Sequence, residues 1–301
     1  MRALVVDPDF HKNRKWVAPG FGYLVEEIIK TFECKIIACQ KDYDKICDDL
    51  EWVFITQPGW SAPWIKFHRN KKHKLAMMTS DPHDKTAWLP QYVSDNGVDY
   101  LLCPYWEASL KFLPTILRKK FVFFPWAIPD ELCAESVKTP SVKDKLMIFG
   151  SMAHDAYALR RWCCKFSFVE KYQRSLEDVG KIPYTDYMKW LGKFGAIVCA
   201  GSWEYPFVFP KFYESASSGS LLFAQEVSDL PLAGFNHTNC VKFREGNFVE
   251  LAAKYLKNPS AFDNVRRNGL KLIKSKHLLS HRLQKLEELF GADEYVERFY
   301  I

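Results

Sequence analysis

Residues 195–224 read "GAIVCAGSWEYPFVFPKFYESASSGSLLFA", and this stretch decides the fold class. It opens with the apolar run "GAIVCA" and closes with the apolar run "SLLFA". Between them, Pro210 suits the first position of a helix, because its φ is already helical and it has no N–H to leave unpaired. Gly219 suits the position just past a helix end, where a left-handed residue is common. The stretch therefore predicts a strand, a loop, a short helix from Pro210 and a second strand.

Short apolar runs of this kind recur along the whole chain. The first half contains "ALVVD" (3–7), "KIIAC" (35–39), "WVFIT" (52–56), "LAMMT" (75–79), "DYLLC" (99–103) and "FVFFP" (121–125). A polar connector, "SVKTPSVKDK" (136–145), precedes "KLMIFG" (145–150), "KFSFVE" (165–170), "GAIVCA" (195–200), "SLLFA" (220–224) and "CVKF" (240–243). Runs that are apolar throughout and alternate with helix-like stretches are typical of parallel strands covered on both faces.

These two series predict the α/β class with two Rossmann-like, doubly wound domains. We place the first domain at residues 1–140, the second at 141–280, and a C-terminal helical segment at 281–301. Two such domains are expected to face each other across a cleft, because ligands of open α/β sheets bind outside the carboxyl ends of the strands.

The composition sets limits on the class of protein. The chain has 301 residues and a net charge of +6, which allows an anionic partner without requiring one. No run reaches the roughly 18 apolar residues of a transmembrane segment. In "MRALVVDPDF" an aspartate follows only four apolar residues, so the apolar region is too short for a signal peptide. Nine cysteines without a Cys-x-x-Cys pair indicate free thiols and a cytoplasmic location. A zinc site of Cys34, Cys39 and a histidine is the alternative.

The predicted helix at Pro210 carries a lysine and a glutamate three residues apart. Its N-terminus should point into the cleft, where unpaired N–H groups and the helix dipole attract anions. Lys211 adds a full positive charge, and Glu214 can accept hydrogen bonds from two adjacent hydroxyls, as on a ribose. Phosphate and ribose side by side describe a nucleotide. The alternative is an ordinary solvated ion pair on a helix surface.

The second half resembles a known family through five segments in a fixed order. They are "SVKDKLMIFGS" (141–151), "AYALRRW" (156–162), "KFYESASSGSLLF" (211–223), "FREGNFVELAAKYLKNPSAF" (243–262) and "NGLKLIKSKHLLSHR" (268–282). Together they resemble the two-domain GT-B glycosyltransferases, most closely the family 1/4-type branch that includes the spore maturation glycosyltransferases. The first half is more weakly similar, mainly in "LAMMTSDPHD" (75–84) and "FVFFPWAIPD" (121–130). The resemblance implies sugar transfer from a nucleotide-diphosphate sugar to an acceptor hydroxyl, with retention, and a last helix that packs back on the first domain.

The resemblance also implies the donor site. Its residues would be Gly150, Ser151, Tyr157, Arg160, Lys211, Glu214, Ser218 and Gly219. Arg160 and Lys211 would be catalytic, because fixed cations stabilise the charge that gathers on the leaving diphosphate. Arg161 is the alternative to Arg160. The family also carries a His-x-x-x-x-Arg near its end, here His277 and Arg282.

One position departs from the family pattern. Related retaining enzymes carry a glutamate eight residues before the one at 214, where this chain has Pro206, and the nearest acidic residue is Glu204. Because that glutamate approaches the donor sugar, its replacement motivates an alternative function, a catalytically inactive nucleotide-sugar-binding protein.

The first domain should hold the acceptor. Gly20 and Gly22 precede a predicted helix, where glycine lets the backbone approach a ligand closely, although a plain loop is the alternative. Asp81 and His83 follow a predicted strand, so we name them as candidate catalytic residues that contact the donor sugar or the acceptor hydroxyl. If the reaction inverts the anomeric carbon, one of them would be the general base.

Metal and cofactor use follow from the same charges. Cationic side chains and a helix end can hold the diphosphate, so we expect no metal and no cofactor besides the nucleotide-diphosphate sugar, which is the donor substrate. The alternative is a metal-dependent site, because Asp7 and Asp9 form an Asp-x-Asp that could hold a metal ion on the diphosphate.

Three basic clusters bear on the acceptor: "HKNRK" (11–15), "HRNKKHK" (68–74) and "RKK" (118–120). They fit an anionic acceptor such as modified DNA, lipid phosphate or a glycan, and a DNA-modifying glycosyltransferase acting on a hydroxylated base is therefore a further alternative. The second cluster follows "WSAPWIKF" (60–67), which reads as an amphipathic helix at a membrane surface or as part of a nucleic-acid groove. Cations that offset a helix dipole are the simpler interpretation.

Overall fold

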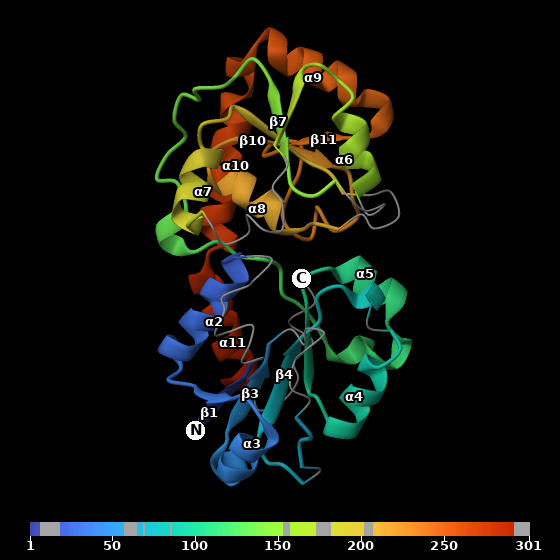
Figure 1. The fold of residues 1–301 in the computed structure, drawn as a ribbon, viewed down its shortest axis with the longest axis vertical. Helices are drawn as coiled ribbons and strands as arrows, with labels where there is room; N and C mark the ends of the chain where they lie inside the picture. The colour runs from blue at the N-terminus through green and yellow to red at the C-terminus, as the bar shows by residue number, and fades with distance from the viewer. Residues whose placement is uncertain are drawn as a thin grey trace. The chain divides into compact units, whose positions relative to one another are not determined.

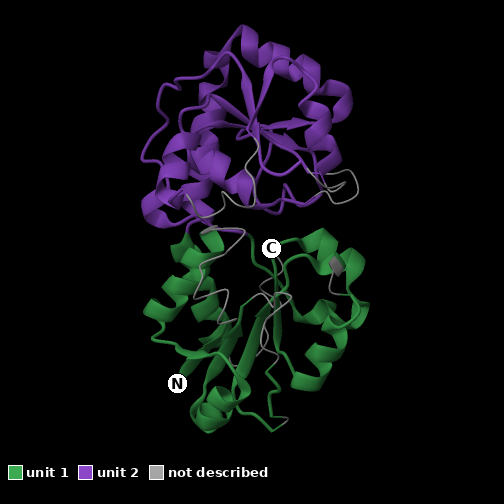
Figure 2. Ribbon diagram, in the orientation of Figure 1, with its two compact units in different colours: residues 1–125, 279–301 green, residues 126–278 purple. Residues whose placement is uncertain are grey.

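The computed structural model of the protein describes residues 1–6, 19–56, 65–68, 70–84, 86–152, 157–172, 182–201 and 207–291. The chain forms two compact units (Figures 1 and 2). Unit 1 contains residues 1–125 and 279–301, and unit 2 contains residues 126–278. Each unit is an α/β structure built on its own parallel sheet, as the apolar runs predict.

The sheet of unit 1 has six strands in the order β2-β1-β3-β4-β5-β6, and neighbouring strands are parallel. The strands are β1 (Arg2–Val5), β2 (Lys35–Ile37), β3 (Trp52–Ile55), β4 (Lys74–Met78), β5 (Tyr100–Cys103) and β6 (Phe121–Phe123). Each corresponds to one predicted apolar run. The helices are α2 (Pro19–Thr31), α3 (Gln40–Ile46), η1 (Cys47–Asp49), η2 (Pro82–Asp84), α4 (Leu89–Asn96), α5 (Trp106–Phe112), η3 (Thr115–Lys120) and α11 (Leu279–Gly291).

Helix α11 belongs to unit 1 although it comes from the end of the described chain. It contacts α2, and the Phe290 ring stacks on Trp52 with 4.0 Å between ring centroids. Arg282 Nε donates to the carbonyl of Pro125 at 2.7 Å. Burial of Leu286 and Leu289 contributes about 1.5–3 kcal/mol for each side chain. Residues 292–301, the rest of the predicted C-terminal segment, lie outside the described residues.

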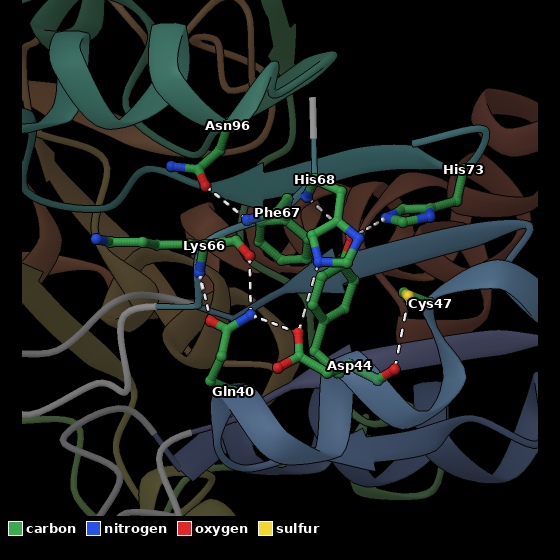
Figure 3. Close-up of polar contacts among 9 residues, drawn as sticks. Gln40, Asp44, Cys47, Lys66, Phe67, His68, His73 and Asn96 are labelled. Atoms are coloured by element: carbon green, nitrogen blue, oxygen red, sulfur yellow. Dashed lines mark hydrogen bonds and ion pairs between the residues drawn. The ribbon is translucent and has the colours of Figure 1, made fainter. Parts of the chain in front are cut away.

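The chain between β3 and β4 includes the segment 60–67, for which an amphipathic helix is one of the predictions. Of that segment the structure describes residues 65–67, and they form no helix. Side chains of α3 and α4 hold this stretch (Figure 3): Lys66 exchanges two hydrogen bonds with the Gln40 amide, and the Phe67 N–H donates to Asn96 Oδ1 at 2.8 Å. Side-chain amides thus replace the backbone partners that a helix would have supplied.

His73, within the second basic cluster, is an interior residue. Its side chain is 2% exposed, its ring packs edge-on against Tyr43, and its Nε2 lies 3.4 Å from the Tyr43 hydroxyl. Burial, followed by the nearby Lys71 charge, lowers the pKa of His73 to about 4. The cluster is therefore not a uniformly solvated cationic face.

Unit 1 should lose stability in mild acid because of His73. As pH falls from about 6.5 to 4, the unfolded chain binds a proton on this histidine before the folded chain does, so the free energy of unfolding falls. The loss is about 1–3 kcal/mol. In urea titrations at several pH values, His73→Gln should show a flatter pH dependence. His68→Gln is the control, because the His68 side chain is 56% exposed. Equal pH dependence in His73→Gln and wild type would contradict the prediction.

The sheet of unit 2 has five parallel strands in the order β11-β10-β9-β7-β8. The strands are β7 (Leu146–Phe149), β8 (Val169–Tyr172), β9 (Ala196–Cys199), β10 (Leu221–Gln225) and β11 (Val241–Phe243). The helices are η4 (Asp130–Leu132), α6 (Ala158–Cys163), α7 (Tyr184–Leu191), α8 (Pro210–Ser217), η7 (Glu245–Asn247), α9 (Phe248–Lys257), η8 (Pro259–Phe262) and α10 (Asp263–Lys276). Helices α6 and α9 share a core with one sheet face, while α8 and α10 pack together on β10 (Figure 1).

The strand order reverses at β7. The chain leaves β7 for β8 on one side and then returns to β9 on the other side. The loops after β7 and β9 therefore run in opposite directions, and an open α/β sheet binds its ligand in the crevice between two such loops.

The boundary between the units differs from the predicted one at 140/141. The chain crosses at 125/126 and again at 278/279. Residues 126–140 belong to unit 2, where the buried Arg266 of α10 donates to the carbonyls of Gly219 and Lys138 at 3.0 and 2.8 Å. The Val142 N–H also donates to the Lys193 carbonyl at 3.0 Å. The backbone of the polar connector is therefore hydrogen-bonded to the second unit, and the connector is part of that unit.

Candidate functional site

Helix α8 lies directly after β9, beside the point where the strand order reverses. It begins at Pro210 and ends at Ser217, and Gly219 has a φ of 78°, which confirms the helix predicted from the sequence. Phe212 and Ala216 are buried on one face. The N-terminus of α8 therefore lies at the carboxyl end of the sheet, where its N–H groups and dipole favour an anion.

Arg160 ties together the two loops that diverge at this point. It lies in α6 and is 4% exposed. Its Nε donates to the Ala200 carbonyl after β9 at 2.9 Å, and its Nη1 donates to the Ser151 carbonyl after β7 at 2.8 Å. The Tyr157 ring lies 4.4 Å from the guanidinium carbon, which is close enough for a cation–π contact.

The charge of Arg160 is held without a carboxylate partner among the described residues. Burial lowers its pKa, but an arginine keeps its proton at any ordinary pH. Backbone carbonyls and an aromatic face thus orient a buried positive charge at the end of the sheet. Arg161, the alternative, donates to the Met152 carbonyl at 3.0 Å and is only half-buried.

Gly150 brings Arg160 and Lys211 together. It has a φ of 110°, a backbone conformation that residues with a side chain rarely adopt. A Cβ at this position would lie 2.9 Å from Arg160 Nη1 and 3.1 Å from Lys211 Cε. The Lys211 Nζ also lies 5.5 Å from the centre of the Phe149 ring. Two cations from α6 and α8 therefore flank one glycine at the end of β7.

Glu214 is buried and bonded to two tyrosines. It is 4% exposed, so the interpretation as a solvated surface pair with Lys211 is wrong. The Tyr184 hydroxyl donates to Oε1 at 3.0 Å, and the Tyr187 hydroxyl donates to Oε2 at 3.1 Å. Sequence reasoning missed both tyrosines. A signal existed, because Tyr184 and Tyr187 are three residues apart and share one face of α7.

Ser218 and Gly219 do not join this group. They lie at the far end of α8, about 12 Å from Lys211 for a helix of this length. The Ser218 hydroxyl donates to the Ser215 carbonyl at 2.8 Å, and a Cβ on Gly219 would lie 3.4 Å from Val137 Cα. Both residues lie at the end of the helix, and Gly219 adjoins the connector, so their role as donor-binding residues stays a prediction that their position does not favour.

The two acceptor-site glycines lie inside α2. The helix begins at Pro19, so Gly20 and Gly22 occupy its first turn instead of the loop before it. The two glycines are therefore helical and do not precede the helix as predicted, and their contact with an acceptor stays a prediction.

Asp81 and His83 follow β4, at the carboxyl end of the unit 1 sheet. Asp81 has a φ of 50°, and His83 lies in η2, half-buried, with its ring 5.9 Å from that of Phe112. They belong to unit 1, whereas Arg160 and Lys211 belong to unit 2.

A sequence profile of the glycosyl transferase-like family matches residues 131–288, which is just over half of the chain. The chain belongs to this glycosyl transferase-like family. The match covers Gly150, Arg160, Lys211 and Glu214. It does not distinguish the spore maturation branch, which stays a prediction. A search of the curated proteins finds no match.

Solved structures show the same fold as this glycosyl transferase-like chain. A mutant of TarM of S. aureus, in complex with fondaparinux, alpha-GlcNAc-glycerol and UDP, is 13% identical with a TM-score of 0.58, and the match covers 85% of this chain and 58% of TarM. Sucrose-phosphate synthase of Thermosynechococcus elongatus is 10% identical with a TM-score of 0.59, covering 90% of this chain and 78% of the synthase. HepE of Anabaena, in complex with UDP and glucose, is 7% identical with a TM-score of 0.59, covering 97% and 99%. The fold is GT-B.

The described part of this glycosyl transferase-like chain contains no cluster of three His, Cys, Asp or Glu side chains placed to hold a metal. All nine cysteines are described, and none forms a disulfide. Asp7, Asp9, Glu204 and Pro206 lie outside the described residues, as does the basic cluster at 11–15. Within the described ranges no helix is both long and apolar enough to cross a bilayer.

Proposed function

We propose that this chain transfers a sugar from a nucleotide-diphosphate sugar to an acceptor hydroxyl. The observation that carries the proposal is Arg160, whose guanidinium bridges the loops after β7 and β9 beside Lys211. This is the position where open α/β sheets bind ligands. The diphosphate gathers negative charge as the glycosidic bond breaks, and preorganised cations stabilise that charge most when they are already fixed.

The nucleotide part of the proposal rests on Glu214 and on the structural neighbours. Glu214 lies one turn into α8 from Lys211, so a diphosphate at the helix N-terminus would bring a ribose towards this carboxylate. TarM and HepE, which share the fold, were solved with UDP. UDP is therefore the first nucleotide to test.

The reaction course is proposed from the same residues. Arg160, Lys211 and the N–H groups of α8 supply positive charge to the diphosphate, so the reaction proceeds without a metal. Retention of the anomeric configuration follows the resemblance to retaining GT-B enzymes, and it requires no protein base on the acceptor face. Asp81 and His83 are then contacts for the donor sugar or the acceptor.

The acceptor is proposed to be anionic. Among the described basic clusters, Arg118 and Lys119 are exposed at the end of η3, whereas His73 of the second cluster is buried. Exposed cations in unit 1 would attract modified DNA, a lipid phosphate or an acidic glycan. A cytoplasmic location is proposed from the cysteine content.

Turnover should continue in the presence of a chelator. The test incubates the protein with UDP-glucose or UDP-GlcNAc and measures UDP release with and without EDTA. Equal rates are expected, because two cations and a helix end already hold the diphosphate. Loss of UDP release in EDTA, restored by magnesium or manganese, would contradict metal independence and move the site towards Asp7 and Asp9.

The same assay separates the alternative functions. UDP binding without UDP release from any nucleotide sugar would favour the inactive binding protein, which Pro206 motivates. The anomeric configuration of the transferred or released sugar, read by NMR, decides between retention and inversion.

A further inference from the structure

We infer that Tyr184 and Tyr187 are positioning residues, which fix the Glu214 carboxylate so that its remaining lone pairs receive the two adjacent hydroxyls of a ribose. The inference rests on the proposed function and adds a specificity to it. The chain should select ribonucleoside diphosphates over their 2′-deoxy forms through two tyrosines that do not themselves touch the nucleotide.

Each oxygen of Glu214 has one tyrosine partner. The two hydroxyl-to-carboxylate distances are 3.0 and 3.1 Å, within hydrogen-bond reach, and Glu214 is 4% exposed. A carboxylate offers about four lone-pair sites. The tyrosines occupy one site on each oxygen, which leaves one on each. Two adjacent hydroxyls, one donating to each oxygen, satisfy that remainder, whereas a single hydroxyl leaves one site empty.

The two tyrosine rings are themselves held by packing. The Tyr184 and Tyr187 rings stack with centroids 5.9 Å apart, and Tyr187 also stacks on Trp190. Burial, followed by the neighbouring Glu214 charge, raises the pKa of Tyr187 well above its usual range, so its phenol remains a donor. A glutamate side chain loses rotamer freedom when it binds a ligand, and the tyrosines remove that freedom before binding.

The same aromatic wall links this carboxylate to the cations. The Phe149 ring lies edge-on to Tyr187 with centroids 5.9 Å apart, and Lys211 Nζ lies 5.5 Å from the centre of the same ring. Glu214 with its tyrosines and Lys211 with Gly150 therefore adjoin one side chain at the end of β7. A ribose on the first group and a diphosphate on the second fit one nucleotide.

The test compares the dissociation constants of UDP and 2′-deoxy-UDP by calorimetry. Wild type should bind UDP more tightly, and Tyr184→Phe and Tyr187→Phe should each lower this preference by about 3- to 10-fold, mainly through weaker UDP binding. The ratio of two affinities on one preparation is insensitive to the fraction of unfolded protein. A loss of stability alone therefore leaves it unchanged.

Tyr255→Phe is the matched control. Tyr255 lies in α9 of the same unit, and its buried hydroxyl has no hydrogen-bond partner within the described part of the chain. This variant loses the same O–H group but should keep both the UDP affinity and the ribose preference. A second test is the Tyr187→Phe change in a Glu214→Gln background. A tyrosine that acts through Glu214 should have no further effect on the preference there.

The outcomes separate this inference from the proposed function. If wild type binds UDP and both phenylalanine variants keep the wild-type ribose preference, the tyrosines are structural only and the inference is overturned, while the proposed function stands. If Tyr187→Phe lowers the preference equally in both backgrounds, it does not act through Glu214, which also overturns the inference. If wild type binds no UDP, the inference and the UDP-dependent form of the proposed function fall together.

Discussion

Replacing Lys211 by methionine should lower the turnover of the nucleotide sugar by about 100- to 1000-fold, the usual cost of removing one fixed group that stabilises transition-state charge. Methionine has nearly the length of lysine without its charge, so the aliphatic contacts near Gly150 and Phe149 persist. The diphosphate gains most of its charge as the bond breaks. The loss should therefore fall more on kcat than on the affinity for UDP.

Steady-state kinetics of UDP release from UDP-glucose or UDP-GlcNAc measure this effect, with thermal unfolding as a check of the fold. Lys254→Met is the control, because Lys254 lies on the surface of unit 2 with its side chain 61% exposed. Its ion pair with Glu250, one turn away, is exposed to solvent and therefore contributes little to stability. Wild-type kcat in Lys211→Met would remove this lysine from the reaction and leave Arg160 as the candidate cation.

Gly150→Ala should cost both stability and nucleotide binding. A residue with a Cβ at a φ of 110° is strained by about 1–3 kcal/mol. The new methyl group would also lie 2.9 Å from Arg160 Nη1 and 3.1 Å from Lys211 Cε, so both cations must move. Because two proposed charged contacts to the diphosphate are displaced together, UDP affinity should fall by roughly 10- to 150-fold or more.

The control for this variant is Gly246→Ala in η7 of the same unit. A Cβ there has no atom within 4 Å, and its φ lies outside the left-handed region, so the change should leave UDP affinity as it is. Calorimetric titration with UDP and urea unfolding of both variants decide the matter. Gly150→Ala with wild-type affinity would show that the cations around this glycine do not bind the diphosphate.

Much of the fold could be predicted because its signals are local. Every strand lies within or overlaps one of the predicted runs. Strands such as β3 and β9 are buried along their whole length and are apolar throughout, since a strand covered on both faces needs apolar side chains on both. Helix α8 begins at Pro210 and ends before Gly219 because a fixed φ starts a helix cheaply and a left-handed residue ends it. Such signals depend only on neighbouring residues.

Other predictions failed where residues distant in the sequence determine the environment of a segment or side chain. The connector at 136–145 is polar and contains proline, yet Arg266 draws it into unit 2 through a hydrogen bond that spans 128 residues of sequence. His73 lies in a run of lysines, yet Tyr43, 30 residues earlier, lines its buried site. A run of charged residues predicts that the side chains in it are exposed to solvent. The prediction fails where a distant element of the fold covers one of these side chains, because the neighbouring sequence carries no information about that element.

The sequence by itself singled out the candidate nucleotide-binding residues: a lysine and a glutamate one turn apart on a helix that follows a strand, and a glycine and an arginine after an earlier strand. Only the tertiary structure decided that Gly150, Arg160 and Lys211 meet while Ser218 and Gly219 do not, and that two tyrosines hold Glu214. The physical reason is the strand order. Because β7 lies next to β9, the loops that follow these two strands start side by side at the carboxyl edge of the sheet. The apolar periodicity within each segment would be the same for any order of the strands, so it does not reveal this neighbourhood.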